Sequence, residues 1–259
     1  MRIAALYDIH GNLPALEAVL EEVRTTGVDR IIVGGDVIPG PMPRETLELL
    51  LRLDTPVQCI RGNGELAVLA QIDAKNASEA TYWGTTSGEP LPEPLQDLLR
   101  WTGRQLRPEQ VRVLRSWPGS LRVDVPGAGT ALFCHGTPRS ETEAFTRLTP
   151  EDRLLPVFQG LDSSLVVCGH THMQFDRMIG PTRVVNAGSV GMPFGRPGAD
   201  WLLLAEALEL RHTSYDLARA ADRIRASSYP HAQEFAVRSM LEPPSEDEML
   251  RAFTDISFK

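Results

Sequence analysis

Short apolar runs with strand character recur along the chain, and each is followed by polar residues. The runs cover residues 2–7, 30–33, 56–60, 131–134 and 165–168. Between the first runs, apolar residues repeat at intervals of three and four, which predicts helices over 12–23 and from Pro43 onward. Pro14 and Pro43 fall in first helical turns, where proline is tolerated. Residues 1–70 therefore predict the order β-α-β-α-β-α of an α/β protein.

The strand signal lapses between Gln71 and Pro118. Helical patterns over 92–101 and 108–117 predict a helical insertion over 71–118. The segment holds three of the four tryptophans, and we expect these side chains to pack the insertion against the sheet. They are Trp83, Trp101 and Trp117.

The remaining chain returns to short strands and ends in helical patterns. Strands are expected at 121–125 and 130–134, a helix at 150–159, and further short strands as far as Ala207. A C-terminal helical extension is expected over 216–259, with its better helical stretches at 216–227 and 246–253. We therefore expect one domain over 1–259 that carries the insertion and the extension.

Residues able to bind a metal ion follow five of the predicted strands. The clusters are Asp8-Ile9-His10, Gly35-Asp36, Gly62-Asn63, Cys134-His135-Gly136 and Gly169-His170-Thr171-His172. The carboxyl ends of neighbouring strands converge on one rim of an α/β sheet, so we expect these side chains to meet. Carboxylate, imidazole and amide groups together suit Mn²⁺, Fe, Zn²⁺ or Co²⁺ better than Ca²⁺. The pattern predicts a two-metal hydrolytic site.

In this order, the five clusters resemble the calcineurin-like metallophosphoesterase superfamily, specifically its small bacterial branch of predicted phosphodiesterases. The resemblance covers most of residues 1–215. The segment 186–191, Asn-Ala-Gly-Ser-Val-Gly, is similar to the Asn-Pro-Gly-Ser-Val turn of that branch, with Ala187 where proline is usual. The resemblance implies a four-layer α-β-β-α sandwich, in which two mixed sheets pack face to face with helices outside.

The resemblance also implies a role for each ligand. One metal would be held by Asp8, His10 and His172, and the other by Asn63, His135 and His170. Asp36 would bridge them. We expect two divalent ions, Mn²⁺ first, with Fe, Zn, Co, Ni or Mg as alternatives. A bridging water or hydroxide would then attack a small phosphoester, with Asp36, Asn63 and His135 as the catalytic residues.

The chain departs from the family pattern at Gly64, where most relatives carry a histidine that protonates the leaving oxygen. A positioned acid is worth about 10²–10⁴ in rate. We therefore expect poor turnover of alkyl monoesters and better turnover of activated or strained diesters, such as a cyclic nucleotide or dinucleotide. Gly64→His is expected to raise monoesterase activity. Glu65, on an open first helical turn, is expected to be ionised rather than to act as a donor.

Three further residues are candidates for contact with a substrate phosphate. Asn12 follows the first cluster, where capping the first helix is the favoured role. Arg139 and Arg196 lie in loops rich in glycine and proline. Arginines in such loops are more commonly solvated, and the alternative is that these two bind a phosphate in a bidentate manner. His212 and His231 are expected at the surface.

The overall charge and the apolar segments limit the partners. The net charge is −8 and no basic tract occurs, which disfavours an extended nucleic-acid groove. No segment has the roughly 18 apolar residues of a membrane span, and the amino terminus lacks signal-peptide character. Cys59, Cys134 and Cys168 lie in predicted buried strands, which favours free thiols and the cytoplasm. The sequence leaves open whether the chain forms a homo-oligomer.

Two other functions compete with the phosphodiesterase. A nuclease would use the same chemistry on nucleic acid, and the acidic charge disfavours it. A catalytically weak metal-binding scaffold or interaction protein is the other alternative. The seven intact ligands count against a scaffold, and Gly64 is the feature that favours it.

Overall fold

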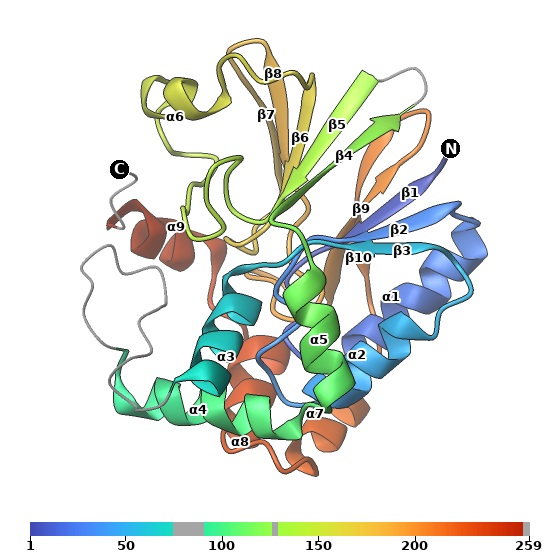
Figure 1. Ribbon diagram of the computed structural model, residues 1–259, viewed down its shortest axis with the longest axis vertical. Helices are drawn as coiled ribbons and strands as arrows, with labels where there is room; N and C mark the ends of the chain where they lie inside the picture. The colour runs from blue at the N-terminus through green and yellow to red at the C-terminus, as the bar shows by residue number, and fades with distance from the viewer. Residues whose placement is uncertain (75–90, 126–128, 256–259) are drawn as a thin grey trace.

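The structure is a computed structural model, and it describes residues 1–74, 91–125 and 129–255. Two five-stranded sheets lie face to face (Figure 1). The first has the order β10-β9-β1-β2-β3 and the second has the order β4-β5-β6-β8-β7. The first contains β1 (Ile3–Leu6), β2 (Arg30–Val33), β3 (Val57–Cys59), β9 (Ala199–Leu204) and β10 (Leu208–Thr213). The second contains β4 (Ser120–Val125), β5 (Gly129–Cys134), β6 (Leu165–Cys168), β7 (Phe175–Ile179) and β8 (Thr182–Asn186).

Both sheets are mixed. In the first sheet, β1, β2 and β3 are parallel neighbours, and β9 and β10 are added as antiparallel strands. In the second sheet, β5, β6 and β8 are parallel, and β4 and β7 pair antiparallel to them. The parallel strands of each sheet end at a common edge, which brings the loops that follow them together.

Helices follow the parallel strands and form the outer layers (Figure 1). α1 (Leu13–Thr26), α2 (Pro43–Leu51) and α3 (Asn63–Asp73) come after β1, β2 and β3 in the chain. α4 (Glu93–Gln105) and α5 (Pro108–Ser116) come next, and α6 (Glu151–Phe158) connects β5 to β6. The C-terminal part contains α7 (Leu217–Arg225), α8 (Ala232–Phe235), the π-helical segment η2 (Ala236–Leu241) and α9 (Glu246–Asp255).

Three apolar clusters separate four layers, because successive side chains of a strand face opposite sides of its sheet. Leu6 of β1 packs on Leu16 of α1, whereas Ile3 of the same strand faces the second sheet. On the other side, Leu132 of β5 packs on Leu154 of α6. The fold is thus the four-layer α/β sandwich with two mixed sheets that the sequence predicts.

Helix α1 shows how local sequence sets the element ends. The side chain of Asn12 accepts a hydrogen bond from the backbone N–H of Ala15 at 3.2 Å, which confirms its predicted capping role. The helix ends at Gly27, whose φ of 68° is left-handed and favours glycine.

Two packing expectations are wrong. Cys59 is only partly buried, because β3 is the outermost strand of its sheet, although all three cysteines are free as expected. Trp117 packs in the core between the first sheet and its helices. Trp101, in contrast, packs on the C-terminal helices, with its ring 5.3 Å from that of Tyr229. Trp83 lies outside the described residues.

The helices α4 and α5 lie within 71–118, and α7 to α9 lie within 216–259. The division of the chain into one domain with an insertion and an extension stays a prediction. Within the described ranges, every helix is too short or too polar to cross a lipid bilayer.

Candidate metal centre

The structure brings all seven predicted ligands to one place. Asp8, His10, Asp36, Asn63, His135, His170 and His172 follow β1, β2, β3, β5 and β6. Asn63 is the first residue of α3, and the others lie in loops. Six of the side chains are buried, and His170 is partly exposed at the edge of a cavity.

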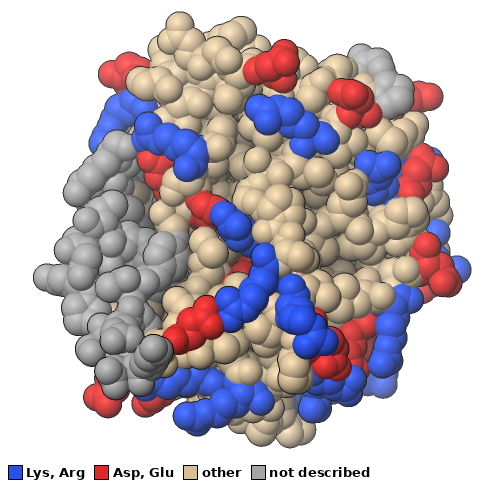
Figure 2. All heavy atoms as spheres, viewed as in Figure 1, with Lys and Arg blue, Asp and Glu red and all other residues tan. Residues whose placement is uncertain are grey.

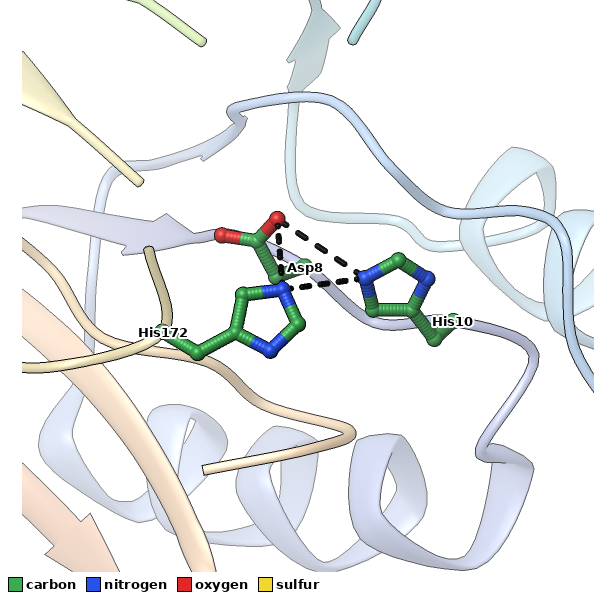
Figure 3. Close-up of side chains that lie close together, drawn as sticks. All are labelled: Asp8, His10 and His172. Carbon is green, nitrogen blue, oxygen red and sulfur yellow. Dashed lines mark hydrogen bonds and ion pairs between the residues drawn. The ribbon is translucent and has the colours of Figure 1, made fainter. Parts of the chain in front are cut away.

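Asp8, His10 and His172 form one group, with their polar atoms facing one another (Figure 3). The Nε2 atoms of His10 and His172 are 3.2 Å apart, and Asp8 Oδ1 lies 3.3 Å from His172 Nε2. Two nitrogens that bind the same ion, each at about 2.1 Å and with an N–metal–N angle near 100°, lie about 3.2 Å apart. The spacing therefore suits a shared cation.

A second group consists of Asp8, Asp36 and His135, and Asp8 therefore belongs to both groups. Asp36 Oδ1 lies 3.5 Å from His135 Nε2, and Asp36 Oδ2 lies 3.8 Å from His10 Nε2. The two oxygens of Asp36 thus face the two groups. Asn63 Oδ1 is 2.9 Å from His135 Nε2, and the ring of His170 is 5.1 Å from that of His135. Asp36 stands where a bridging carboxylate would have to be.

The backbone at the ligands is strained. Five of them have a positive φ, between 49° and 65°. Among the described residues, they are the only non-glycine residues with a positive φ. This left-handed conformation is unfavourable for a side chain and persists only where the surroundings impose it, typically at functional sites. They are Asp8, His10, Asp36, His170 and His172.

Backbone carbonyls fix the imidazole rings. The Nδ1 atoms of His10, His135 and His172 lie 3.3, 2.9 and 2.9 Å from the carbonyl oxygens of Pro39, Gly34 and Met192. Because a carbonyl only accepts, each Nδ1 carries a proton, which leaves each Nε2 as the ring atom that could bind a metal ion. Metal-binding histidines are held in this way.

The cluster contains an unsatisfied acceptor that fits a cation. Asp8 Oδ2 accepts the N–H of His170 at 2.8 Å, whereas Asp8 Oδ1 is buried and has no hydrogen-bond partner. Such an atom requires an explanation in a native structure, and a bound ion is one. The Nε2 atoms of His10 and His172 lie close to Asp8 Oδ1. A divalent cation between them would be bound by this oxygen and by both nitrogens. The residues present therefore fit a divalent metal ion.

The buried carboxylates control protonation in the metal-free cluster. Burial alone would lower the pKa of His135, but the charges of Asp36 and Asp8 raise that pKa to about 10. Burial lowers the pKa of His170 to about 4. In the absence of metal, His135 is therefore the positively charged imidazolium at neutral pH, and His170 is the neutral imidazole.

Glu65 is not on an open turn, so that expectation is wrong. Its side chain is completely buried, and its oxygens accept the backbone N–H groups of Gly62, Asp36 and Ile38 at 2.7, 2.9 and 3.2 Å. Burial and the nearby Asp36 raise the pKa of Glu65 to about 7. Glu65 thus ties the start of α3 to the loop that carries Asp36.

The space beside Gly64 is filled, so the structure gives no support to the expectation that Gly64→His raises monoesterase activity. A Cβ atom at Gly64 would lie 2.2 Å from the carbonyl oxygen of Ile38 and 2.9 Å from Asp36 Oδ1. The N–H of Gly64 also donates to Asp36 Oδ1 at 2.6 Å. A histidine would therefore displace the Asp36 loop rather than supply an acid.

The segment 186–191 braces the ligand loops. The Asn186 amide donates to the carbonyl of Gly169 and to the hydroxyl of Thr171, at 2.6 and 3.1 Å. The Ser189 hydroxyl donates to the carbonyl of Asp8 at 2.7 Å. This role was not assigned from the sequence, although the family turn marked the segment.

The three predicted substrate contacts do not lie on the cavity beside the cluster. Asn12 is fully buried, and its amide donates to the carbonyl of Gly191 at 2.8 Å. Arg139 forms an ion pair with Glu143, and Arg196 lies 3.7 Å from Asp200. Within the part of the chain that the structure describes, none of the three lines the cavity. Substrate contact by these residues is therefore not supported.

His212 is also placed differently from the prediction. Its Nδ1 lies 2.7 Å from Asp200 Oδ1, and its side chain is only 15% exposed. His231 is exposed, as expected.

The cavity has a volume of about 530 Å³ and an apolar wall that the sequence analysis did not identify. The wall comes from α4, from the loop after residue 191 and from the C-terminal helices. Its members are Leu95, Leu98, Met192, Phe194, Tyr229, Phe235 and Phe253. Their apolar character was visible in the sequence, but nothing local linked these three segments to one site.

A four-layer α/β sandwich with Asp, His and Asn side chains at the ends of its parallel strands is the architecture of a metallophosphoesterase. The chain belongs to the calcineurin-like phosphoesterase superfamily, whose domain model matches residues 1–206. It is therefore a phosphoric ester hydrolase of a family that uses divalent metals.

Similarity to known proteins covers nearly the whole chain. An uncharacterized protein of Methanocaldococcus jannaschii is 26% identical over 248 residues, which cover 88% of this chain and 93% of that protein. The crystal structure of a metallophosphoesterase from Sphaerobacter thermophilus matches with a TM-score of 0.68 and 25% identity, covering 92% of this chain and 98% of that one.

A shorter match involves a symmetrical bis(5'-nucleosyl)-tetraphosphatase of Pseudomonas syringae. It is 37% identical over 108 residues, which cover 40% of this chain and 35% of that protein.

Asp36→Asn should lower metal binding to fewer than two ions per chain without unfolding the protein. The amide keeps an oxygen that can accept the N–H of Gly64, but it removes the charge shared between the two groups. Metal content after dialysis against Mn²⁺, together with circular dichroism, measures both effects. Asp54→Asn, an exposed change away from the cluster, is the control. Full metal content in Asp36→Asn would contradict a bridging role.

Glu65→Gln should destabilise the metal-free protein by about 1–3 kcal/mol at pH 8, because an amide N–H₂ would replace one acceptor facing backbone donors. Urea unfolding should show a lower midpoint at an unchanged slope. The exposed Glu109→Gln should change stability by less than about 0.5 kcal/mol. An unshifted midpoint in Glu65→Gln would show that the three hydrogen bonds carry no net stability.

Binding of Mn²⁺ at pH 8 should release about one proton from His135, because the pKa of that side chain is raised to about 10 in the metal-free protein. His170, with a pKa of about 4, has none to release. Affinity for Mn²⁺ should therefore rise between about pH 7 and pH 9. Calorimetry in buffers with different ionisation enthalpies measures the proton, and His231→Gln should leave it unchanged. A binding enthalpy independent of the buffer would refute this protonation state.

Proposed function

We propose that this protein is a two-metal phosphodiesterase that hydrolyses a small phosphoester, with Mn²⁺ as the preferred ion. The observation that carries the proposal is the position of Asp36, whose two oxygens face two groups of buried acceptors. Asp8, His10 and His172 would hold one ion, and Asn63, His135 and His170 the other. Two divalent cations there would lower the pKa of a shared water and neutralise the phosphoryl oxygens.

The residues around the cluster determine what such a site can do. Carbonyl-anchored histidines keep their Nε2 atoms aimed inward, so little movement of the rings is needed on metal binding. Asn63 and His135 lie next to each other beside Oδ1 of Asp36. In this position they would orient a phosphoryl oxygen. Asp36, Asn63 and His135 are therefore the proposed catalytic residues.

The missing acid favours diesters with good leaving groups. Gly64 has no side chain to protonate a leaving oxygen, and the carbonyl of Ile38 occupies the adjacent space. Glu65 cannot replace the acid, because its buried oxygens are held by three backbone donors. An alkoxide leaving group would depart slowly, whereas an activated or strained ester would not need the proton.

Nucleotides are the proposed source of the ester. The tetraphosphatase relatives act on bis-nucleosyl compounds according to their name, but they match this chain over only 108 residues. A cyclic nucleotide or dinucleotide is therefore proposed on the size of the cavity, which is about 530 Å³ and suits a small ligand. An extended nucleic acid is less suitable, because on the face shown in Figure 2 basic side chains stand among acidic ones. Arg61, for example, pairs with Glu141.

Metal-stripped protein titrated with Mn²⁺ should hydrolyse bis-p-nitrophenyl phosphate faster than p-nitrophenyl phosphate, with activity reaching its maximum at two ions per chain. Both rates and the bound metal should be measured on the same sample. Two bound ions without turnover of either ester would refute the enzyme and support the scaffold. Faster turnover of the monoester would refute the preference for diesters.

A further inference from the structure

We infer that the cavity beside the cluster selects a monoanionic phosphodiester carrying a flat aromatic group and rejects polyphosphates. This inference rests on the proposed function and narrows its substrate class. It comes from the apolar wall, which includes Leu95, Leu98, Phe194, Tyr229, Phe235 and Phe253.

The charges around the cavity suit one phosphoryl group. Two divalent cations beside the carboxylates of Asp8 and Asp36, together with the proposed bridging hydroxide, would leave a surplus of about one positive charge. Among the described residues that line the cavity, none is a lysine or an arginine. A second or third phosphate would therefore lie against apolar side chains, with no lysine or arginine among the described lining residues to pair it, and burying an unpaired charge is strongly unfavourable.

An aromatic ring adjoins the cluster directly. The ring of Phe194 stacks on that of His172, with centroids 5.2 Å apart and an interplanar angle of 19°. The ring of His172 is fixed in turn by the carbonyl of Met192. A substrate whose phosphoryl group reaches the cluster would therefore bring its ester group next to Phe194.

The part of the wall that contains Tyr229 is held in place by aromatic packing. Tyr229 contacts Trp101 and Phe235 edge to face, with ring centroids 5.3 and 6.0 Å away. Such pairs have a preferred geometry, so Tyr229 offers a fixed surface. A flat group such as a nucleobase or a phenyl ring would be stabilised by stacking on aromatic side chains of this wall.

Two binding contrasts on Mn²⁺-loaded protein test the inference by calorimetry, without relying on turnover. Methyl phenylphosphonate and dimethyl phosphate carry the same charge and differ in the ring. The phenyl compound should bind about tenfold more tightly. Adenosine monophosphate and its methylene-bridged triphosphate analogue share the base and differ in charge. The monophosphate should bind at least as tightly as the triphosphate analogue.

Variants of the wall separate aromatic stacking from simple burial. Phe194→Ala should abolish the preference for the phenyl compound, and Phe194→Leu should retain only part of it. Leu98→Ala, on α4, is a second variant that should weaken the preference if Phe194→Ala does not fold. Leu148→Ala, an exposed change outside the cavity, should leave the preference intact.

The result distinguishes this inference from the proposed function. Equal binding of the two monoanions, an unchanged preference in Phe194→Ala, or tighter binding of the triphosphate analogue would overturn the inference. Each would do so even if bis-p-nitrophenyl phosphate is hydrolysed. A ring preference that Phe194→Ala removes, in a protein that hydrolyses neither ester, would support the cavity assignment while refuting the phosphodiesterase.

Discussion

The structure depends on one electrostatic constraint, because buried carboxylate oxygens and imidazole Nε2 atoms face one another at short distances. Asp8 Oδ1 has no hydrogen-bond partner, and the Nε2 atoms of His10 and His172 approach to 3.2 Å. Lone pairs at this distance repel one another unless a proton or a cation lies between them. In the metal-free protein, the raised pKa of His135 supplies part of that compensation as a proton. Divalent ions would supply it fully, which couples metal binding to the stability of the site.

The surrounding fold holds this unfavourable arrangement in place. Parallel strands from both sheets end beside the cluster, and the loops that follow adopt left-handed backbone at five ligands. Hydrogen bonds between distant segments impose this conformation. Ser189 holds the carbonyl of Asp8, and Glu65 holds the N–H groups around Asp36. Neither residue reaches the cavity, so their contribution to function is to position the ligands.

Local patterns in the sequence predicted the strands and the polar clusters that follow them, whereas the four layers were implied by the family resemblance. Strand runs followed by polar clusters place Asp8 and His135 at strand ends without knowledge of the tertiary structure. The environment of Glu65 could not be predicted in this way, because its burial comes from a loop 27 residues earlier in the chain. The pairing of Trp101 with Tyr229 likewise joins segments distant in sequence. Periodicity predicts which face of a helix is buried but not which element covers it.

Two features have a common chemical consequence: a general acid is missing at position 64, and the cavity has an apolar wall. With Gly64 against the carbonyl of Ile38, departure of the leaving group depends on the stability of the leaving oxyanion. Aryl and strained cyclic esters meet that condition, and the aryl or base group is also what the wall around Phe194 accommodates. The apolar surroundings strengthen each charge interaction at the cluster by lowering the local dielectric. They also make additional phosphates unfavourable. Leaving-group stability and cavity polarity therefore favour the same substrates, although the two features arise from different parts of the chain.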